Sequence, residues 1–367
     1  MKVLYLCNIP SPYRVAFFNE LSKKVELTVI YERKSALNRN EEWQSENSST
    51  YKSIFLKGIE IGLETAFAPS VLKYLKNDTY DLIIIGGYST STSMLAIIAL
   101  KFRKIPYVLN ADGGFIKKDS ILRLKIKNFF IGGAYAWLSS GKATSSYFLH
   151  YKAKKDMVFE YPFTSINKKD IVKNIVSADE KNKIKRNLGI KEDKIVLSVG
   201  QFIKRKGFDI LLKSWIDMPK EYGLYIIGDK ATEEYITLKN DLNLNGVHFV
   251  GFLDKEKLKK YYMASDLFVH PTREDIWGLV INEAMAYGLV VISTENCNAG
   301  IELVDNKNGF ILPVEDIEGT NKAIRKVLSD EKLQNKMSKS SLKKINTYTI
   351  ENMALRHVEI FNILLDR

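Results

Sequence analysis

The chain has 367 residues, 46% of them hydrophobic and 27% charged, which suits about two globular domains and excludes a disordered protein. No apolar run reaches the ~20 residues that a bilayer-spanning helix requires. The two cysteines, Cys7 and Cys297, match no metal or redox spacing. Reduced thiols, together with an N-terminus that lacks a signal-peptide pattern, predict a cytoplasmic protein.

The net charge of +12 is unevenly distributed along the chain. Residues 1–165 carry 23 Lys and Arg against 14 Asp and Glu, whereas residues 166–367 carry 32 against 29. A basic excess indicates a polyanionic partner or an anionic surface. A Lys-rich and Asn-rich composition would also drift basic without any partner, and the charge alone does not separate these explanations.

The first half alternates strand-like apolar runs with helical patterns. Strands are predicted at 2–7, 26–31, 81–87, 106–110 and 135–140, with a polar loop at 34–52. Continuous apolar runs bounded by Gly or Pro suit strands that are buried on both faces of a parallel sheet. The alternation breaks at 161–170, which predicts a domain boundary there.

A second series of strands and helices follows. Its strands are predicted at 194–200, 223–229, 247–253, 266–271, 290–294 and 309–313. The tail from about 319 to 366 is predicted to be helical, with a break near 345–352. The fold class is therefore α/β with two doubly wound domains, and ligands are expected at the carboxyl ends of the strands.

In the loop "SVGQFIKRKGFDILL" (198–212), the cations Arg205 and Lys206 come just before a predicted helix. A helix N-terminus offers unpaired N–H groups, and these cations would add forked and point-charge donors for a diphosphate. The spacing is not that of a P-loop. A solvated basic turn would explain the segment equally well.

The segment "HPTREDIWGLVINEAMAYG" (270–288) carries three carboxylates, Glu274, Asp275 and Glu283. Asp275 comes before a helix predicted to start near Gly278, and Glu283 lies in the first turns of that helix. Glu283 would suit a pair of ribose hydroxyls, and Asp275 would suit hydroxyls of a second sugar. Taken alone, Glu283 is better explained as charge compensation at a helix N-terminus. Cations on one loop and carboxylates on the other together indicate a nucleotide sugar.

These segments resemble family 4 retaining glycosyltransferases of the GT-B fold. Residues 270–294 look like the E-x7-E region of that family, 198–212 like its phosphate-gripping loop, and 347–361 like its closing helix. Residues 6–24 resemble the N-terminal loop of a bacterial branch that acts in surface-polysaccharide synthesis. The resemblance spans most of the chain and is most specific in the second half.

The resemblance implies two Rossmann-like domains that face a central cleft. Residues 1–165 would form the acceptor-binding domain and 166–345 the nucleotide-sugar-binding domain, while 346–367 would be a helix that returns to the first domain. The implied reaction is retaining transfer of a hexose from a nucleotide sugar, with UDP the commonest nucleotide, to a saccharide or lipid-linked saccharide. No cofactor is expected.

The resemblance also implies residue roles. Arg205 and Lys206 would neutralise the diphosphate, Glu283 would hold the ribose, and Asp275 would hold the transferred sugar. Further donor contacts are expected from Gly200, Gln201, Val250, Gly251, Phe252, Leu253, Ile276, Trp277, Gly278 and Leu279.

Three departures from the family pattern suggest altered donor contacts. The spacing puts the first acid at Asp275 and not at Glu274. Ile276 replaces a usual small residue, and Gln201 stands where a cation is common.

Acceptor or sugar contacts are expected in the first domain. Ser11, Tyr13 and Arg14 end the first strand-to-helix loop, and Asp112 precedes Gly113 and Gly114, which would let a ligand approach the backbone. A plain Asp-Gly turn explains Asp112 about as well. No Asp-x-Asp pair lies at a strand end. The four histidines are scattered, and each is more easily explained as structural than as a metal ligand. We therefore predict no metal requirement.

Residues 115–138 form a basic amphipathic segment. Leu122, Ile126, Phe129 and Phe130 follow i, i+4, i+7 and i+8 spacing, among Lys118, Arg123, Lys125 and Lys127. Such a helix can lie on an anionic membrane, here the inner face of the cytoplasmic membrane. It can equally pack its apolar stripe on its own sheet.

Two other classes of function remain open. A sugar-nucleotide epimerase can share the GT-B-like architecture. A nucleic-acid-binding protein would explain the charge, but no aromatic-basic recognition motif supports it. A Rossmann dehydrogenase is disfavoured because no G-x-G-x-x-G follows the first strand.

Overall fold

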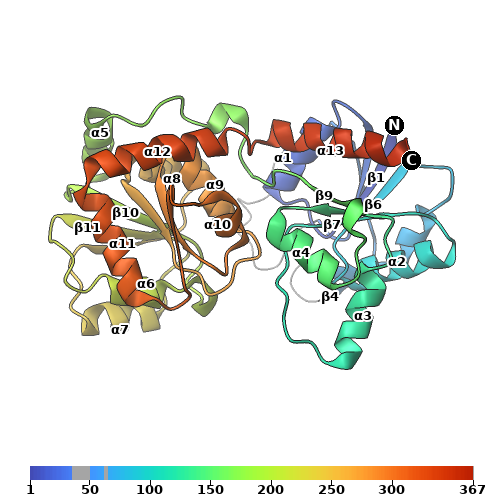
Figure 1. The fold of residues 1–367 in the computed structure, drawn as a ribbon, viewed down its shortest axis with the longest axis horizontal. Coiled ribbons are helices and arrows are strands. Elements are labelled where there is room, and N and C mark those ends of the chain that lie inside the picture. The colour runs from blue at the N-terminus through green and yellow to red at the C-terminus, as the bar shows by residue number, and fades with distance from the viewer. Residues whose placement is uncertain (35–49, 62–64, 367) are drawn as a thin grey trace. The chain divides into compact units, whose positions relative to one another are not determined.

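Two parallel sheets form the framework, one in each of two units (Figure 1). The computed structural model describes residues 1–34, 50–61 and 65–366, so most of the polar loop expected at 34–52 lies outside the described residues. Unit 1 consists of Met1–Ser165 with Thr349–Arg367, and unit 2 of Ile166–Tyr348.

The sheet of unit 1 has the strand order β3-β2-β1-β6-β7-β8-β9, and every neighbouring pair is parallel. Its inner strands are continuous apolar segments because both faces are buried; Val3, for example, pairs with Leu27 on one side and Leu82 on the other. The strands are β1 (Lys2–Cys7), β2 (Glu26–Tyr31), β3 (Lys52–Phe55), β6 (Leu82–Gly86), β7 (Val108–Ala111), β8 (Ala136–Ser139) and β9 (Val158–Glu160).

The other elements of unit 1 surround this sheet. A small antiparallel hairpin pairs β4 with β5. The elements are α1 (Pro12–Leu21), β4 (Ile59–Ile61), β5 (Thr65–Phe67), α2 (Ser91–Phe102), α3 (Ile121–Ile131) and α4 (Lys142–His150).

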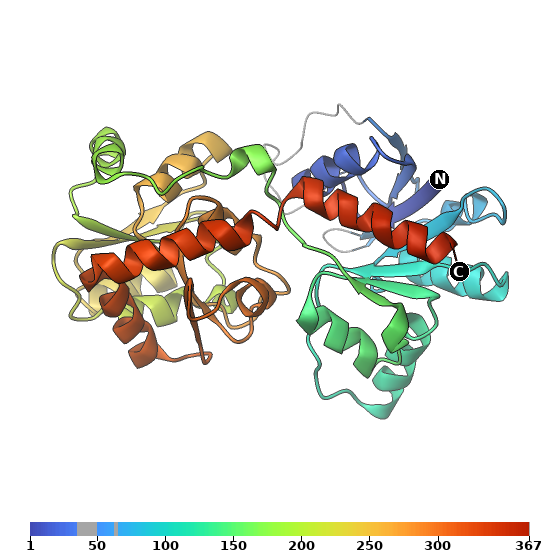
Figure 2. The ribbon, with the colours of Figure 1, turned by 45° about the horizontal axis from the view of Figure 1, so that its top comes forward.

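The last helix, α13 (Ile350–Leu365), packs on α1 and belongs to unit 1 (Figures 1 and 2). The Thr349 hydroxyl caps it by accepting a hydrogen bond from the Asn352 amide. His357 is buried on this helix, with its ring centroid 4.6 Å from that of Phe17. Burial lowers the pKa of His357 to about 3, so this histidine is a neutral core residue.

The sheet of unit 2 has the order β12-β11-β10-β13-β14-β15, again all parallel. Its strands are β10 (Lys194–Val199), β11 (Tyr222–Ile227), β12 (Val247–Val250), β13 (Leu267–His270), β14 (Val290–Thr294) and β15 (Gly309–Leu312). Its helices are α5 (Ala178–Leu188), α6 (Phe208–Ser214), α7 (Glu233–Asp241), α8 (Lys255–Ala264), α9 (Leu279–Ala286), α10 (Asn298–Leu303), α11 (Ile317–Ser329) and α12 (Glu331–Ile345).

The strand order of unit 2 places its two predicted loops side by side. Strands β10 and β13 are neighbours, and the order runs away from them in opposite directions. Crevices at such a switch point are the usual ligand sites of doubly wound sheets. The loops that follow these two strands are those that carry Lys206 and Asp275.

Candidate functional site

The cationic turn of unit 2 lies against the loop after β13. Arg205 and Lys206 end a short 3-10 turn, and Gly207 follows with a φ of +69°. A Cβ on Gly207 would lie 2.0 Å from the Pro271 carbonyl oxygen, so only glycine allows this approach. The Thr272 hydroxyl and the Arg273 amide donate hydrogen bonds to the Arg205 carbonyl oxygen at 2.9 and 2.8 Å.

The acidic loop has a fixed backbone. The Asp275 amide donates a hydrogen bond to the Asn296 carbonyl oxygen at 2.8 Å. Gly278 has a φ of +98° immediately before α9, and a Cβ there would lie 2.8 Å from the Cys297 Sγ. Glu283 lies on α9, where its carboxylate accepts a hydrogen bond from the Tyr262 hydroxyl at 3.0 Å.

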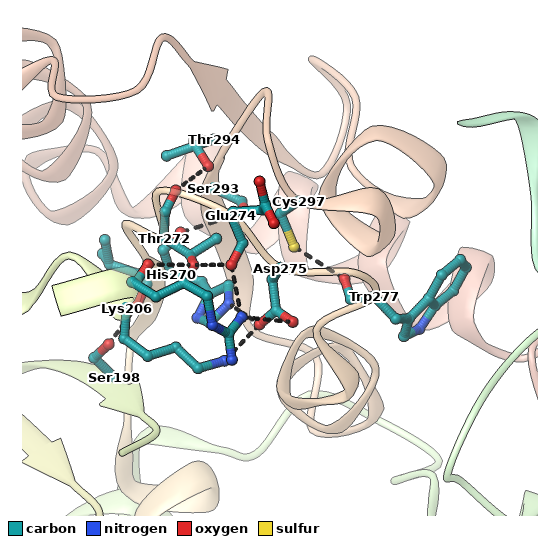
Figure 3. Close-up of polar contacts among 12 residues, drawn as sticks. Ser198, Lys206, His270, Thr272, Glu274, Asp275, Trp277, Ser293, Thr294 and Cys297 are labelled. Carbon is teal, nitrogen blue, oxygen red and sulfur yellow. Dashed lines mark hydrogen bonds and ion pairs between the residues drawn. The ribbon is translucent and has the colours of Figure 1, made fainter. Parts of the chain in front are cut away.

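Asp275 joins the two loops through its carboxylate (Figure 3). The Lys206 ammonium lies 2.5 Å from its Oδ2, and the Arg205 guanidinium lies 3.5 Å from its Oδ1. The His270 Nε2 lies 3.0 Å from the same Oδ2. Two cations and one histidine therefore converge on a single carboxylate, and we call these four residues the Asp275 cluster.

The Asp275 cluster has a defined charge state. Burial opposes ionisation of Asp275, but the hydrogen bond from His270 and the Lys206 charge outweigh it and hold the pKa of this carboxyl far below its usual range. Burial lowers the pKa of His270. The imidazole is then neutral at pH 7, and Nε2–H is assigned as the donor to Asp275 because that carboxylate can only accept. His270 Nδ1 has no hydrogen-bond partner among the described residues.

The structure thus brings Arg205 and Lys206 together with Asp275, which follows them in the sequence by 70 and 69 residues. It also adds His270, which the sequence analysis treated as structural. The available signal was its position as the last residue of β13, five residues before Asp275. Glu274 contributes its backbone to the cluster, since its carbonyl oxygen accepts a hydrogen bond from Arg205 at 2.6 Å.

The other predicted donor contacts differ in exposure. Trp277 is buried, and its indole N–H donates to the Asn282 Oδ1 at 2.8 Å, so its ring is part of the core. Ile276 is exposed, as are Gln201 and Phe252. Gly278 is buried and Gly251 is exposed. The remaining positions are half-buried; they are Gly200, Val250, Leu253 and Leu279.

The residues predicted in unit 1 form a second polar cluster. Arg14 is buried and its Nη2 lies 2.5 Å from the Asp112 Oδ1, while the Tyr13 hydroxyl donates to Asp112 Oδ2 at 2.9 Å. Arg14 also donates to the Asn110 Oδ1 at 3.3 Å. The predicted residues Ser11, Gly113 and Gly114 flank this cluster in the chain.

The described residues contain neither a metal-binding cluster nor a membrane-spanning helix. No group of three or more His, Cys, Asp or Glu side chains could hold a metal ion there. Among the described helices, none is both long enough and apolar enough to cross a bilayer.

Comparison with known proteins identifies a domain around the Asp275 cluster. Residues 180–344 match the family model "Glycosyl transferases group 1". The chain is 33% identical over 189 residues to an uncharacterized glycosyltransferase of Haemophilus influenzae, covering 49% of this chain and 53% of that protein. It is 31% identical over 146 residues to the lipopolysaccharide core biosynthesis glycosyltransferase LpsE of Rhizobium meliloti, covering 39% and 42%. The chain thus spans about half the length of these curated relatives.

Solved structures resemble this chain over nearly its whole length. Anabaena Alr3699/HepE in complex with UDP and glucose superposes with a TM-score of 0.77 at 18% identity, covering 99% of this chain and 100% of that chain. WaaG, a glycosyltransferase involved in lipopolysaccharide biosynthesis, superposes with a TM-score of 0.71 at 18% identity, covering 98% and 99%. These structures confirm the predicted fold class, α/β of the GT-B type.

Proposed function

We propose that this protein is a retaining glycosyltransferase that moves a hexose from a UDP-sugar to a saccharide or lipid-linked saccharide acceptor. The proposed setting is cell-surface polysaccharide synthesis at the cytoplasmic side of the membrane. Relatives named for lipopolysaccharide synthesis and a structural neighbour that binds UDP and glucose support this choice. Family 4 membership is part of the proposal and rests on the motifs around Asp275 and Glu283.

The observation that carries the proposal is the position of Lys206 and Arg205 at the switch point of unit 2, inside the region that matches the family model. A diphosphate beside these cations would meet a forked and a point-charge donor. The amides from Ile276 to Leu279 precede or begin α9, and they would add N–H donors and the positive end of the helix dipole. Glu283 on the same helix would then receive the ribose hydroxyls.

Transfer requires one bond to break and one to form at the same face of the sugar. The bond from C1 to the phosphate oxygen breaks, the bond from C1 to the acceptor oxygen forms, and the acceptor proton passes to the leaving phosphate. We assign no protein nucleophile. The protein contributes positioning and stabilises the charge that develops on the leaving diphosphate. Lys206 and Arg205 are the groups that would supply that stabilisation.

Asp275 has two roles in this proposal. Its Oδ2 orients Lys206 from 2.5 Å, so that the ammonium is already in place when the diphosphate arrives. Its Oδ1 lies 3.5 Å from Arg205 and retains capacity to accept a hydroxyl of the transferred sugar.

The test is release of UDP from a panel of UDP-hexoses, with and without a lipid-linked saccharide acceptor. We expect release that depends on the acceptor and persists in EDTA, because the proposed chemistry needs no metal. Interconversion of two sugar nucleotides without an acceptor would instead identify an epimerase. Loss of activity in EDTA that Mg²⁺ or Mn²⁺ restores would contradict metal independence.

A further inference from the structure

Helix α3 of unit 1 turns most of its apolar stripe outward. Ile121 is 78% exposed, Leu122 69%, Ile126 43% and Phe129 47%. The helix packs on the core of unit 1 through other residues, Leu124, Phe130 and Ile131. The sequence left open whether the stripe packs on its own sheet. Of its four predicted residues, only Phe130 is buried in the core of unit 1.

The end of α2 extends the same apolar surface. The Lys101 ammonium lies 3.7 Å from the centroid of the Phe129 ring and donates a hydrogen bond to the Phe129 carbonyl oxygen at 2.7 Å. This contact places the end of α2 beside the end of α3 (Figure 1). Phe102, next to Lys101 in sequence, is 89% exposed, and Ile98 is exposed one turn earlier. We call Ile98, Phe102, Ile121, Leu122, Ile126 and Phe129 the α2–α3 surface.

The chain segment that borders the α2–α3 surface is rich in cations and has almost no acidic residues. Residues 117–127 contain five Lys or Arg and one acid, Asp119. Lys127 lies 2.9 Å from that carboxylate and so neutralises it within the fold. Three cations remain exposed without a hydrogen bond or ion pair from their side chains to the described residues: Lys118, Arg123 and Lys125.

A pocket of about 350 Å³ adjoins the end of α2. Its lining includes Lys101, Lys104 and Tyr135. Two of its lining residues, Lys101 and Lys104, are cations, and such a pair suits a phosphate group of a lipid.

We propose that the α2–α3 surface docks on an anionic lipid bilayer, with its apolar side chains in the headgroup boundary and its cations on lipid phosphates. Apolar side chains bordered by Lys and Arg are the composition that binds such membranes. The bordering charge also disfavours a second copy of this chain, because two such surfaces would bring like charges together. Vesicle binding needs no donor or acceptor, so its failure would leave the proposed transferase function untouched.

The experiment measures co-sedimentation with phosphatidylcholine vesicles, with or without phosphatidylglycerol. We expect binding only to the anionic vesicles, with release at high salt. The double variant Arg123→Gln/Lys125→Gln should bind roughly 30-fold more weakly, and Leu122→Ser/Ile126→Ser should also lose binding. Matched controls are Lys23→Gln/Lys24→Gln, exposed cations after α1, and Leu355→Ser, an exposed apolar residue on α13.

Three outcomes would overturn the proposal. The first is that the wild-type protein does not bind anionic vesicles. The second is that both α3 double variants bind them as strongly as the wild type does. A dimer in solution that becomes monomeric on Leu122→Ser/Ile126→Ser, with vesicle binding unchanged, would assign the surface to a second copy. Melting temperatures of all variants establish that each one is folded.

Discussion

Replacing Lys206 by alanine will lower turnover at least ~100-fold, which corresponds to about 2.7 kcal/mol of lost transition-state stabilisation. The reason is its position: the side chain is 13% exposed, and its ammonium is held 2.5 Å from Asp275 at the carboxyl ends of β10 and β13, where the diphosphate would lie. The measurement is the initial rate of UDP release with saturating donor and acceptor. The effect should fall mainly on kcat, because charge on the leaving group develops in the transition state.

Lys204→Ala is the matched control for this variant. Lys204 is an exposed lysine on the same 3-10 turn, and its carbonyl oxygen, which alanine retains, accepts a hydrogen bond from Arg273. Near-wild-type turnover is expected from the control. Near-wild-type turnover from folded Lys206→Ala would remove Lys206 from the active site and with it the proposed mechanism.

Asp275→Asn will lower turnover about 10-fold or more, whereas Glu274→Gln will change it less than about twofold. The amide of asparagine cannot supply the negative charge that orients Lys206, and its –NH2 group is a donor where His270 and Lys206 both donate. Glu274 contributes its backbone carbonyl to the cluster, and this group survives the substitution to glutamine. The measurement is turnover of the two variants side by side. A larger loss in Glu274→Gln than in Asp275→Asn would assign the first acid of the motif to Glu274.

The charge of Asp275 should also be visible in stability against pH. The pKa of this carboxyl is depressed in the folded protein, so its stabilising contribution is complete above the unfolded value of about 3.9 and is lost as pH falls below it. Losing one partner of a largely buried pair costs about 3 kcal/mol. The difference in unfolding free energy between wild type and Asp275→Asn should therefore be constant from pH 7 to about 5 and shrink towards pH 3. A difference that does not depend on pH would mean that the charge of Asp275 is not stabilising.

The strands were predictable because parallel strands buried on both faces form continuous apolar runs. The predicted ranges 2–7, 26–31 and 290–294 coincide with β1, β2 and β14. The edge strands β3 and β9 were missed, since they are short and only partly buried and give no such run. The β4–β5 hairpin was missed because each of its strands has three residues.

The site was predictable in its loops but not in its contacts. Helix-start signals and spacing pointed to Arg205, Lys206, Asp275 and Glu283 one at a time. The pairing of Lys206 with Asp275 depends on β10 lying beside β13, a strand order that no local pattern encodes. For the same reason His270 appeared as an isolated histidine, although it lies directly against Asp275.

The direction in which α3 faces also could not be predicted from its period. Apolar residues occur on two stripes of this helix, one with Leu122, Ile126 and Phe129, the other with Leu124 and Ile131. Both stripes have helical spacing, so the period predicts a helix without selecting its buried side. The structure buries Ile131 completely and leaves Leu122 exposed.

The most direct test of the central claim, a nucleotide-sugar site in unit 2, is calorimetric titration of UDP, GDP and ADP into wild type, Lys206→Ala and Glu283→Gln. We predict that one nucleotide, expected to be UDP, binds wild type, and that each substitution weakens it by about tenfold or more, because the diphosphate and the ribose each lose a partner. The control Lys204→Ala should bind like wild type. Undiminished binding to both site variants, or no binding of any nucleotide to wild type, would contradict the account.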